Sequence, residues 1–402
     1  MSKSDSHHAH QVQTKSTEID PYRIFFPLGI ITGILGVSFW PLYSFGWIEA
    51  IHSQAHIDMQ LQGFLYAFIL GFLLTAIPRF SRTWPASKAE LIVFVSLFIV
   101  GNISTLFGYF LLGRLCFFLS IISLFIFSAR RFIRRQANPP NQFIFVGMGI
   151  LVGFFASSIR ILLQLGWASL RGIEEFSVRR MLSEGMTTFL VLGIGAKLIP
   201  LFFGFKSYSQ AGDPVEHEKQ SIKERIWFLG LATIVLVSFF IEMNGMEKIA
   251  LYIRAIVVSI VLLFHVKIWK KLKSTGVMVR VIQGSCWAIL LSFWGAVIHP
   301  EYRIEVLHIL FISGFATLIM SIATRVVLSH GNYPVEHEKK SKSLLIGAIL
   351  LLFSTVFRSV SSLFPMHYFH LLGIAGVLFI AGFFVWGSEY VKKIAHKAPK
   401  QI

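Results

Sequence analysis

The sequence predicts an all-α polytopic membrane protein with about twelve transmembrane helices. Three observations support this fold class. The 402 residues are 55% hydrophobic with a mean hydropathy of +0.68, and only 14% are charged. Apolar runs of bilayer-spanning length recur along the chain. Basic residues gather in alternate connections between these runs. A soluble domain could not bury this much apolar surface.

The apolar runs define the expected helices in order. The first predicted helix is expected to remain in the protein, because the polar segment that precedes it is too long for a signal peptide. The third and fourth runs are separated only by Leu112, Gly113 and Arg114, which predicts a tight hairpin there. The chain thus divides into a disordered tail (1–22), one transmembrane domain (23–390) and a basic tail (391–402). The runs cover 24–44, 57–77, 90–111, 113–129, 142–165, 184–205, 226–243, 248–268, 280–299, 304–328, 343–363 and 367–388.

The formal net charge is +17, and the basic residues responsible for it lie mainly in the connections between the predicted helices. With the N-terminus in the cytoplasm, the inner loops and C-terminal tail hold most of the Lys and Arg residues, and the outer loops hold few. The positive-inside rule then predicts that both termini are cytoplasmic. The excess of basic residues also favours binding of anionic lipid at the inner membrane surface. A nucleic-acid partner is therefore not needed to explain the positive charge. Cys116 and Cys286 lie inside apolar runs without a Cys-x-x-Cys pair, which predicts buried free thiols.

An internal repeat organises the chain. Gln62-Gly63 through Ile77-Pro78 recurs as Glu184-Gly185 through Ile199-Pro200, an offset of 122 residues. The hexapeptide Pro-Val-Glu-His-Glu-Lys at 214–219 recurs at 334–339, an offset of 120. These offsets predict three four-helix pseudo-repeats, in which the second, sixth and tenth helices are equivalent.

Six histidines are predicted at one depth, near the outer ends of three helices. Neutral imidazole is a good ligand for iron, copper or zinc, and histidines from separate helices commonly hold haem. His56 and His308 are the first candidates, because each lies about one turn inside an apolar run, on equivalent helices. His370 comes next. The alternative is that a histidine of this kind only hydrogen-bonds to headgroups or water. The six are His52, His56, His299, His308, His367 and His370.

Three arginines lie inside predicted helices towards the same outer half: Arg160, Arg254 and Arg358. An intramembrane arginine usually faces a polar interior and pairs with an anion, and haem propionates would suit such a partner. The alternatives are that these side chains extend to the outer surface or pair with Glu184.

At these residues the sequence resembles the NnrS family, which comprises bacterial twelve-helix membrane proteins that contain haem and copper and are linked to the response to nitric oxide. The first motif runs from His56 through Gly63 and Gly71 to Pro78. The second runs from His308 through Gly314 to His330-Gly331. Asp58 and Arg79 depart from the family pattern, since many members carry a second histidine and an asparagine there.

The layout is also similar to the main subunit of haem–copper oxidases and nitric oxide reductases, whose haem histidines lie on helices two and ten. That subunit needs copper-binding histidines on helices six and seven, and the runs at 184–205 and 226–243 contain none. An oxygen-reducing binuclear centre is therefore not expected.

The resemblance implies a haem b held by His56 and His308, with copper as a further metal and His52 as a further metal ligand. It also implies a role in nitric oxide response or resistance, with a small diatomic such as nitric oxide as the ligand. No step of a reaction is visible in the sequence, so no catalytic residue is assigned. Two alternatives stay open: a cofactor-free transporter of an anion or metal complex, and a quinol-linked electron-transfer subunit with a second haem.

Overall fold

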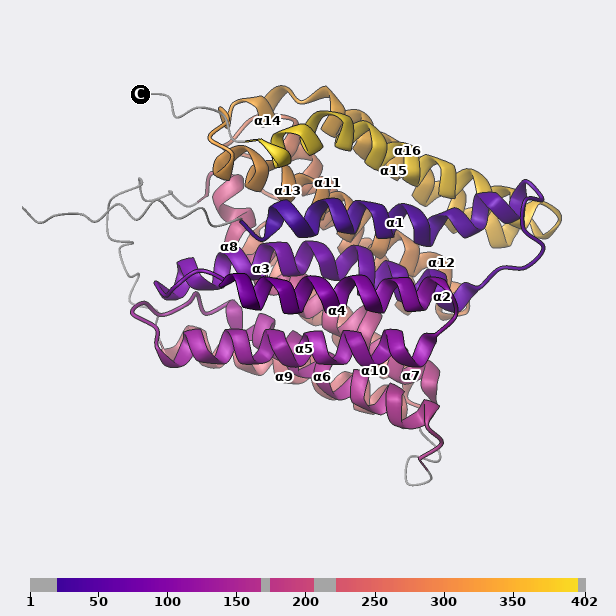
Figure 1. The fold of residues 1–402 in the computed structure, drawn as a ribbon, viewed down its shortest axis with the longest axis horizontal. Coiled ribbons are helices and arrows are strands. Elements are labelled where there is room, and N and C mark those ends of the chain that lie inside the picture. The colour runs from indigo at the N-terminus through magenta and orange to yellow at the C-terminus, as the bar shows by residue number, and fades with distance from the viewer. Residues whose placement is uncertain (1–19, 168–173, 206–221, 397–402) are drawn as a thin grey trace, which may run out of the picture.

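The computed structural model describes residues 20–167, 174–205 and 222–396. Twelve of its helices are long and apolar enough to cross a membrane, and the described residues contain no strand. They lie roughly parallel in one bundle (Figure 1). The all-α polytopic prediction is therefore confirmed.

The spans are numbered one to twelve in chain order. Several run beyond their predicted bounds, notably the sixth, which begins at Glu175, where the sequence predicted residue 184. They are α1 (Tyr22–Ser44), α2–α3 (Ser53–Ser81), α4 (Lys88–Leu106), α5 (Phe110–Ile133), α6 (Phe143–Gln164), α7–α8 (Glu175–Phe202), α9 (Ile222–Met243), α10 and its extension (Glu247–Val266), α11 (Val277–Ile298), α12–α13 with their leading turn (Pro300–His330), α15 and its last turn (Lys342–Leu363), and α16 with its leading turn (Pro365–Ala395). The short helix α14 (His337–Lys340) lies outside the spans.

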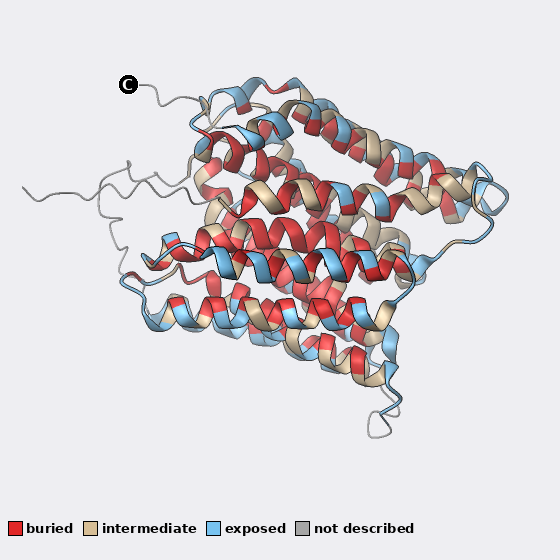
Figure 2. Ribbon diagram, in the orientation of Figure 1, coloured by how far each residue is buried: buried red, intermediate tan, exposed pale blue. Residues whose placement is uncertain are grey.

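Spans two, six and ten share an unusual construction. Each begins with a short α-helix, continues as a π-helical segment and then returns to α-helix. These three spans are also the most buried of the twelve, so they form the centre of the bundle (Figure 2). This agrees with their predicted equivalence in a three-part repeat. The segments are Met59–Leu65, Met181–Met186 and Ile309–Ala316.

The hairpin between the third and fourth spans lies earlier than predicted. The turn is made by Phe107–Tyr109, where Gly108 has φ +83°. Gly113 lies inside α5 instead, and a Cβ atom there would meet Thr105 Oγ1 at 2.3 Å. The predicted position of the turn was wrong because Gly113 was interpreted as a turn residue, whereas it permits close packing of two helices.

The two ends of the described chain lie at one end of the bundle, which we call the terminal end. Tyr22 begins α1, and α16 continues to Ala395, so residues 391–395 are helical although the sequence assigned them to a tail. The Arg23 guanidinium donates to the Ile394 carbonyl. Residues 1–19 and 397–402 lie outside the described residues, as does the first copy of the duplicated loop at 214–219.

Candidate functional site

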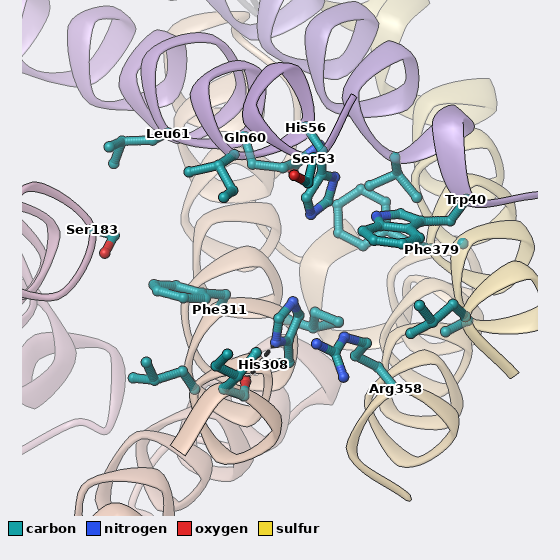
Figure 3. Close-up of a pocket in the computed structure, with 18 of the residues that line it drawn as sticks. Trp40, Ser53, His56, Gln60, Leu61, Ser183, His308, Phe311, Arg358 and Phe379 are labelled. Carbon is teal, nitrogen blue, oxygen red and sulfur yellow. Dashed lines mark hydrogen bonds between the residues drawn. The ribbon is translucent and has the colours of Figure 1, made fainter. Parts of the chain in front are cut away.

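A cavity of about 400 Å³ lies in the half of the bundle away from the terminal end. Its walls come from spans one, two, six, ten, eleven and twelve. His56 and His308 both line it, and Figure 3 shows their rings directed into the same space from different helices. Trp40, Phe311 and Phe379 supply much of the apolar wall.

His56 is held by the first span. Its Nδ1 atom lies 2.8 Å from the Gly36 carbonyl oxygen, and its ring meets the Trp40 indole edge to face at 5.4 Å. A Cβ atom on Gly36 would lie 2.7 Å from Gln60 Nε2, so glycine permits this close approach of the two helices. A carbonyl oxygen only accepts hydrogen bonds, so Nδ1 is the donor. In the neutral ring Nε2 then carries the lone pair.

His308 also binds a carbonyl oxygen through Nδ1, but this carbonyl lies four residues earlier in its own helix. It ends α12, and its Nδ1 atom lies 2.7 Å from the Ile304 carbonyl oxygen. The π-helical segment follows directly at Ile309, and such segments occur frequently at functional sites. His308 therefore also keeps Nε2 available as an acceptor or metal ligand.

Four arginines line the cavity, and two of them, Arg180 and Arg303, are paired with buried glutamates. The other two are Arg358 and Arg179. Arg358 is buried, donates to Ser361 Oγ at 3.2 Å and has Glu305 Oε1 4.0 Å away. Arg179 is half-buried, and its one hydrogen-bond partner among the described residues is Gln54 Oε1 at 3.5 Å. In the described part of the chain, neither guanidinium makes a close carboxylate contact, so both can take an anion in the cavity.

The donor set fits a haem: two imidazoles with free Nε2 atoms, flat apolar walls, and guanidinium groups for propionates.

A family model described as NnrS protein matches residues 19–397. The chain belongs to the NnrS family. No curated protein matches the chain. Membership, together with the twelve apolar helices, identifies a multi-pass membrane protein of a family associated with the nitric oxide response.

The other outer histidines of this NnrS-family chain lie elsewhere. His52, His299, His367 and His370 are all exposed, and none lines the cavity. Of the six predicted histidines the structure thus brings together two. Within the three described ranges, no group of three or more His, Cys, Asp and Glu side chains is placed to hold a metal ion.

Arg160 and Arg254, which the sequence suggested as propionate partners, do not line the cavity. Arg160 donates to Asp58 at 2.9 Å, and both side chains are fully buried. Arg254 is bound to Glu242 and lies 3.4 Å from Glu184. These carboxylates already balance the two buried charges.

An ion cluster that the sequence did not predict forms part of the cavity wall, to which it contributes Arg180, Glu184 and Arg303. Arg303 Nη2 donates to Glu184 Oε2 at 2.8 Å and its Nη1 to Glu242 Oε1 at 2.6 Å. Arg180 Nη1 also reaches Glu242 Oε1, at 2.5 Å. Arg180 and Arg303 sat in predicted outer loops, and Arg179 did too. The available signal was Glu184, a carboxylate inside an apolar run, since such a group requires cations nearby.

Proposed function

We propose that this NnrS-family protein holds a haem b in the cavity, and that His56 and His308 would bind its iron. The observation that carries the proposal is the matched pair of Nδ1-to-carbonyl hydrogen bonds on two histidines that line one cavity. Such bonds fix the tautomer and the ring orientation of metal-binding histidines. Arg358 and Arg179 would hold the propionates.

The protein residues would position and shield the group. The Gly36 and Ile304 carbonyls orient the two rings, while Phe64, Phe311 and Phe379 give the cavity apolar walls that exclude water. A bound haem would supply an iron centre that changes oxidation state, and a small diatomic molecule could bind to it only in place of one of the two histidines. Nitric oxide is the diatomic that we propose, following the association of the family.

Haem has more support here than copper. Asp58, at the position where family members carry a second histidine, accepts from Arg160 at 2.9 Å and from Gln62 at 3.1 Å. His52 is exposed and does not line the cavity. Copper near the mouth of the second span would need other ligands.

We place the protein in the bacterial inner membrane with the terminal end in the cytoplasm. The support is the charge distribution, because the connections at the terminal end carry most of the basic residues. The cavity would then lie towards the periplasmic side.

The test is a reduced-minus-oxidised spectrum of protein purified with adequate haem supply. The wild type is expected to show a b-type spectrum that His56→Ala and His308→Ala both lose. His52→Ala and His370→Ala are matched controls from the same end of the bundle and are expected to keep it. A spectrum that survives both cavity variants would discard these ligands. A colourless wild type would overturn the haem proposal and leave the transporter alternative.

A further inference from the structure

A second hollow lies at the terminal end, far along the bundle from the histidine cavity. Its volume is about 480 Å³. Four of its six lining residues are lysines, and the other two are aromatic. The lining residues are Phe205, Lys267, Trp269, Lys270, Lys271 and Lys273.

The loop that carries the lysines has a defined conformation. Lys267 adopts a left-handed conformation, φ +64°, which ends the eighth span. The Lys273 amide donates to the Phe203 carbonyl at 3.0 Å, and the Gln283 side chain donates to the Ile268 carbonyl at 2.7 Å. The loop is therefore attached to both the sixth and the ninth spans, which fixes where the lysines lie.

Within residues 20–167, 174–205 and 222–396, no acidic side chain balances the positive charge of this hollow. All four lysines are exposed, and residues 267–276 include no acidic residue. Among the described residues, no carboxylate forms an ion pair with any of the four. Four cations close together repel one another, so an anion would be drawn to the hollow.

The border of the hollow is apolar on the side of the eighth span. Phe264 is 72% exposed and Trp269 is 60% exposed, while the Trp269 indole is held by a 2.9 Å hydrogen bond to the Leu263 carbonyl. Exposed aromatic side chains at the end of a span are typical of the membrane–water interface. The lysines of the hollow thus lie next to an exposed aromatic side chain, Trp269, at the end of a membrane-spanning helix.

We propose that this hollow binds the phosphate headgroup of an anionic phospholipid. The lysines would contact the headgroup phosphate, and Trp269 and Phe264 would lie along the upper part of the acyl chains. A free phosphate would use the lysines but would gain nothing from the exposed aromatic border. The combination therefore favours a lipid.

The test counts lipids retained by the whole purified protein in native mass spectrometry, after delipidation and incubation with phosphatidylglycerol, cardiolipin or phosphatidylcholine. The variant replaces Lys267, Lys270, Lys271 and Lys273 with Gln. The matched control replaces four other exposed lysines of the terminal end, Lys88, Lys340, Lys342 and Lys392, so the net charge changes equally. A milder pair, Lys270→Gln with Lys271→Gln, guards against misfolding of the fourfold variant.

Wild type and control are expected to retain one more anionic lipid than the fourfold variant, with at least tenfold tighter binding, because each cation near an anionic surface contributes on the order of fivefold. The milder pair should fall between them. The proposal would be overturned if all the proteins retained the same number of anionic lipids. It would also be overturned if the wild type retained phosphatidylcholine as well as it retains the anionic lipids. Displacement of the lipid by millimolar inorganic phosphate would assign the hollow to free phosphate and also overturn it.

Discussion

His56 and His308 make the same contact: each ring binds a backbone carbonyl through Nδ1, at 2.8 Å and 2.7 Å, and both line one cavity. The two rings come from the second and tenth spans, and each has its Nδ1 atom occupied by a carbonyl oxygen. The carbonyls of Gly36 and Ile304 are therefore as much a part of the site as the rings.

Arg358→Gln and Arg179→Gln are each expected to weaken haem retention on the order of tenfold. The reason is the loss of one charge-assisted hydrogen bond to a propionate, which contributes about 1.5–3 kcal/mol. The rate of haem transfer to apomyoglobin measures the effect. Arg135→Gln, an exposed arginine at the other end, is the control. Transfer rates equal to the wild type in both cavity variants would remove these arginines from the site.

Asp58→Ala is expected to destabilise the protein by about 3–5 kcal/mol, because it removes the buried carboxylate that pairs with Arg160 and leaves only the exposed Glu175, at 3.5 Å. The double variant Asp58→Leu with Arg160→Met removes both charges and should recover most of this loss. Thermal unfolding in detergent gives the comparison. A double variant no more stable than Asp58→Ala would show that the 2.9 Å ion pair is not the source of the effect.

Gly113→Ala is expected to destabilise the hairpin of the third and fourth spans by about 1–3 kcal/mol. The added methyl group would meet Thr105 Oγ1 at 2.3 Å and the Gly101 carbonyl at 3.1 Å. Adding Thr105→Ala should restore part of the stability, since it removes the nearer atom. No rescue in a thermal unfolding assay would contradict the close packing of α4 on α5.

Lys340→Cys and Glu301→Cys report the orientation in the membrane. Both positions are exposed, and they lie at opposite ends of the bundle. The native Cys116 and Cys286 are buried and give little background. A membrane-impermeant maleimide should label Glu301→Cys in spheroplasts and label Lys340→Cys only after lysis. The reverse pattern would invert the proposed topology.

Hydropathy predicted the spans well because bilayer crossing is a property of composition along the chain. The repeat also carried information: the 122-residue offset made the second and sixth spans equivalent, and both have the same π-helical segment. His56 and His308 could be selected because a polar ring just inside an apolar run is costly unless it has a role. The structure brings these two together in one cavity.

The partners of the arginines could not be predicted in the same way. Sequence shows that Arg160 and Arg358 lie inside spans, but not which carboxylate each faces. Arg160 meets Asp58 across the bundle, whereas Arg358 is 4.0 Å from its nearest carboxylate oxygen, on Glu305. This difference depends on how each helix is rotated about its own axis, because the rotation decides which neighbour a side chain faces. Hydropathy along the sequence does not give that rotation. The same limit hid Arg179, which was assigned to a loop.

The most direct test of the central claim is rescue by added imidazole in His56→Gly and His308→Gly. Each variant should lose its low-spin b-type spectrum, and free imidazole should restore it by filling the space that the side chain leaves. The exposed His370→Gly should need no rescue. Restoration is expected in both cavity variants. An unchanged haem spectrum in either variant before imidazole is added would contradict axial ligation by that histidine.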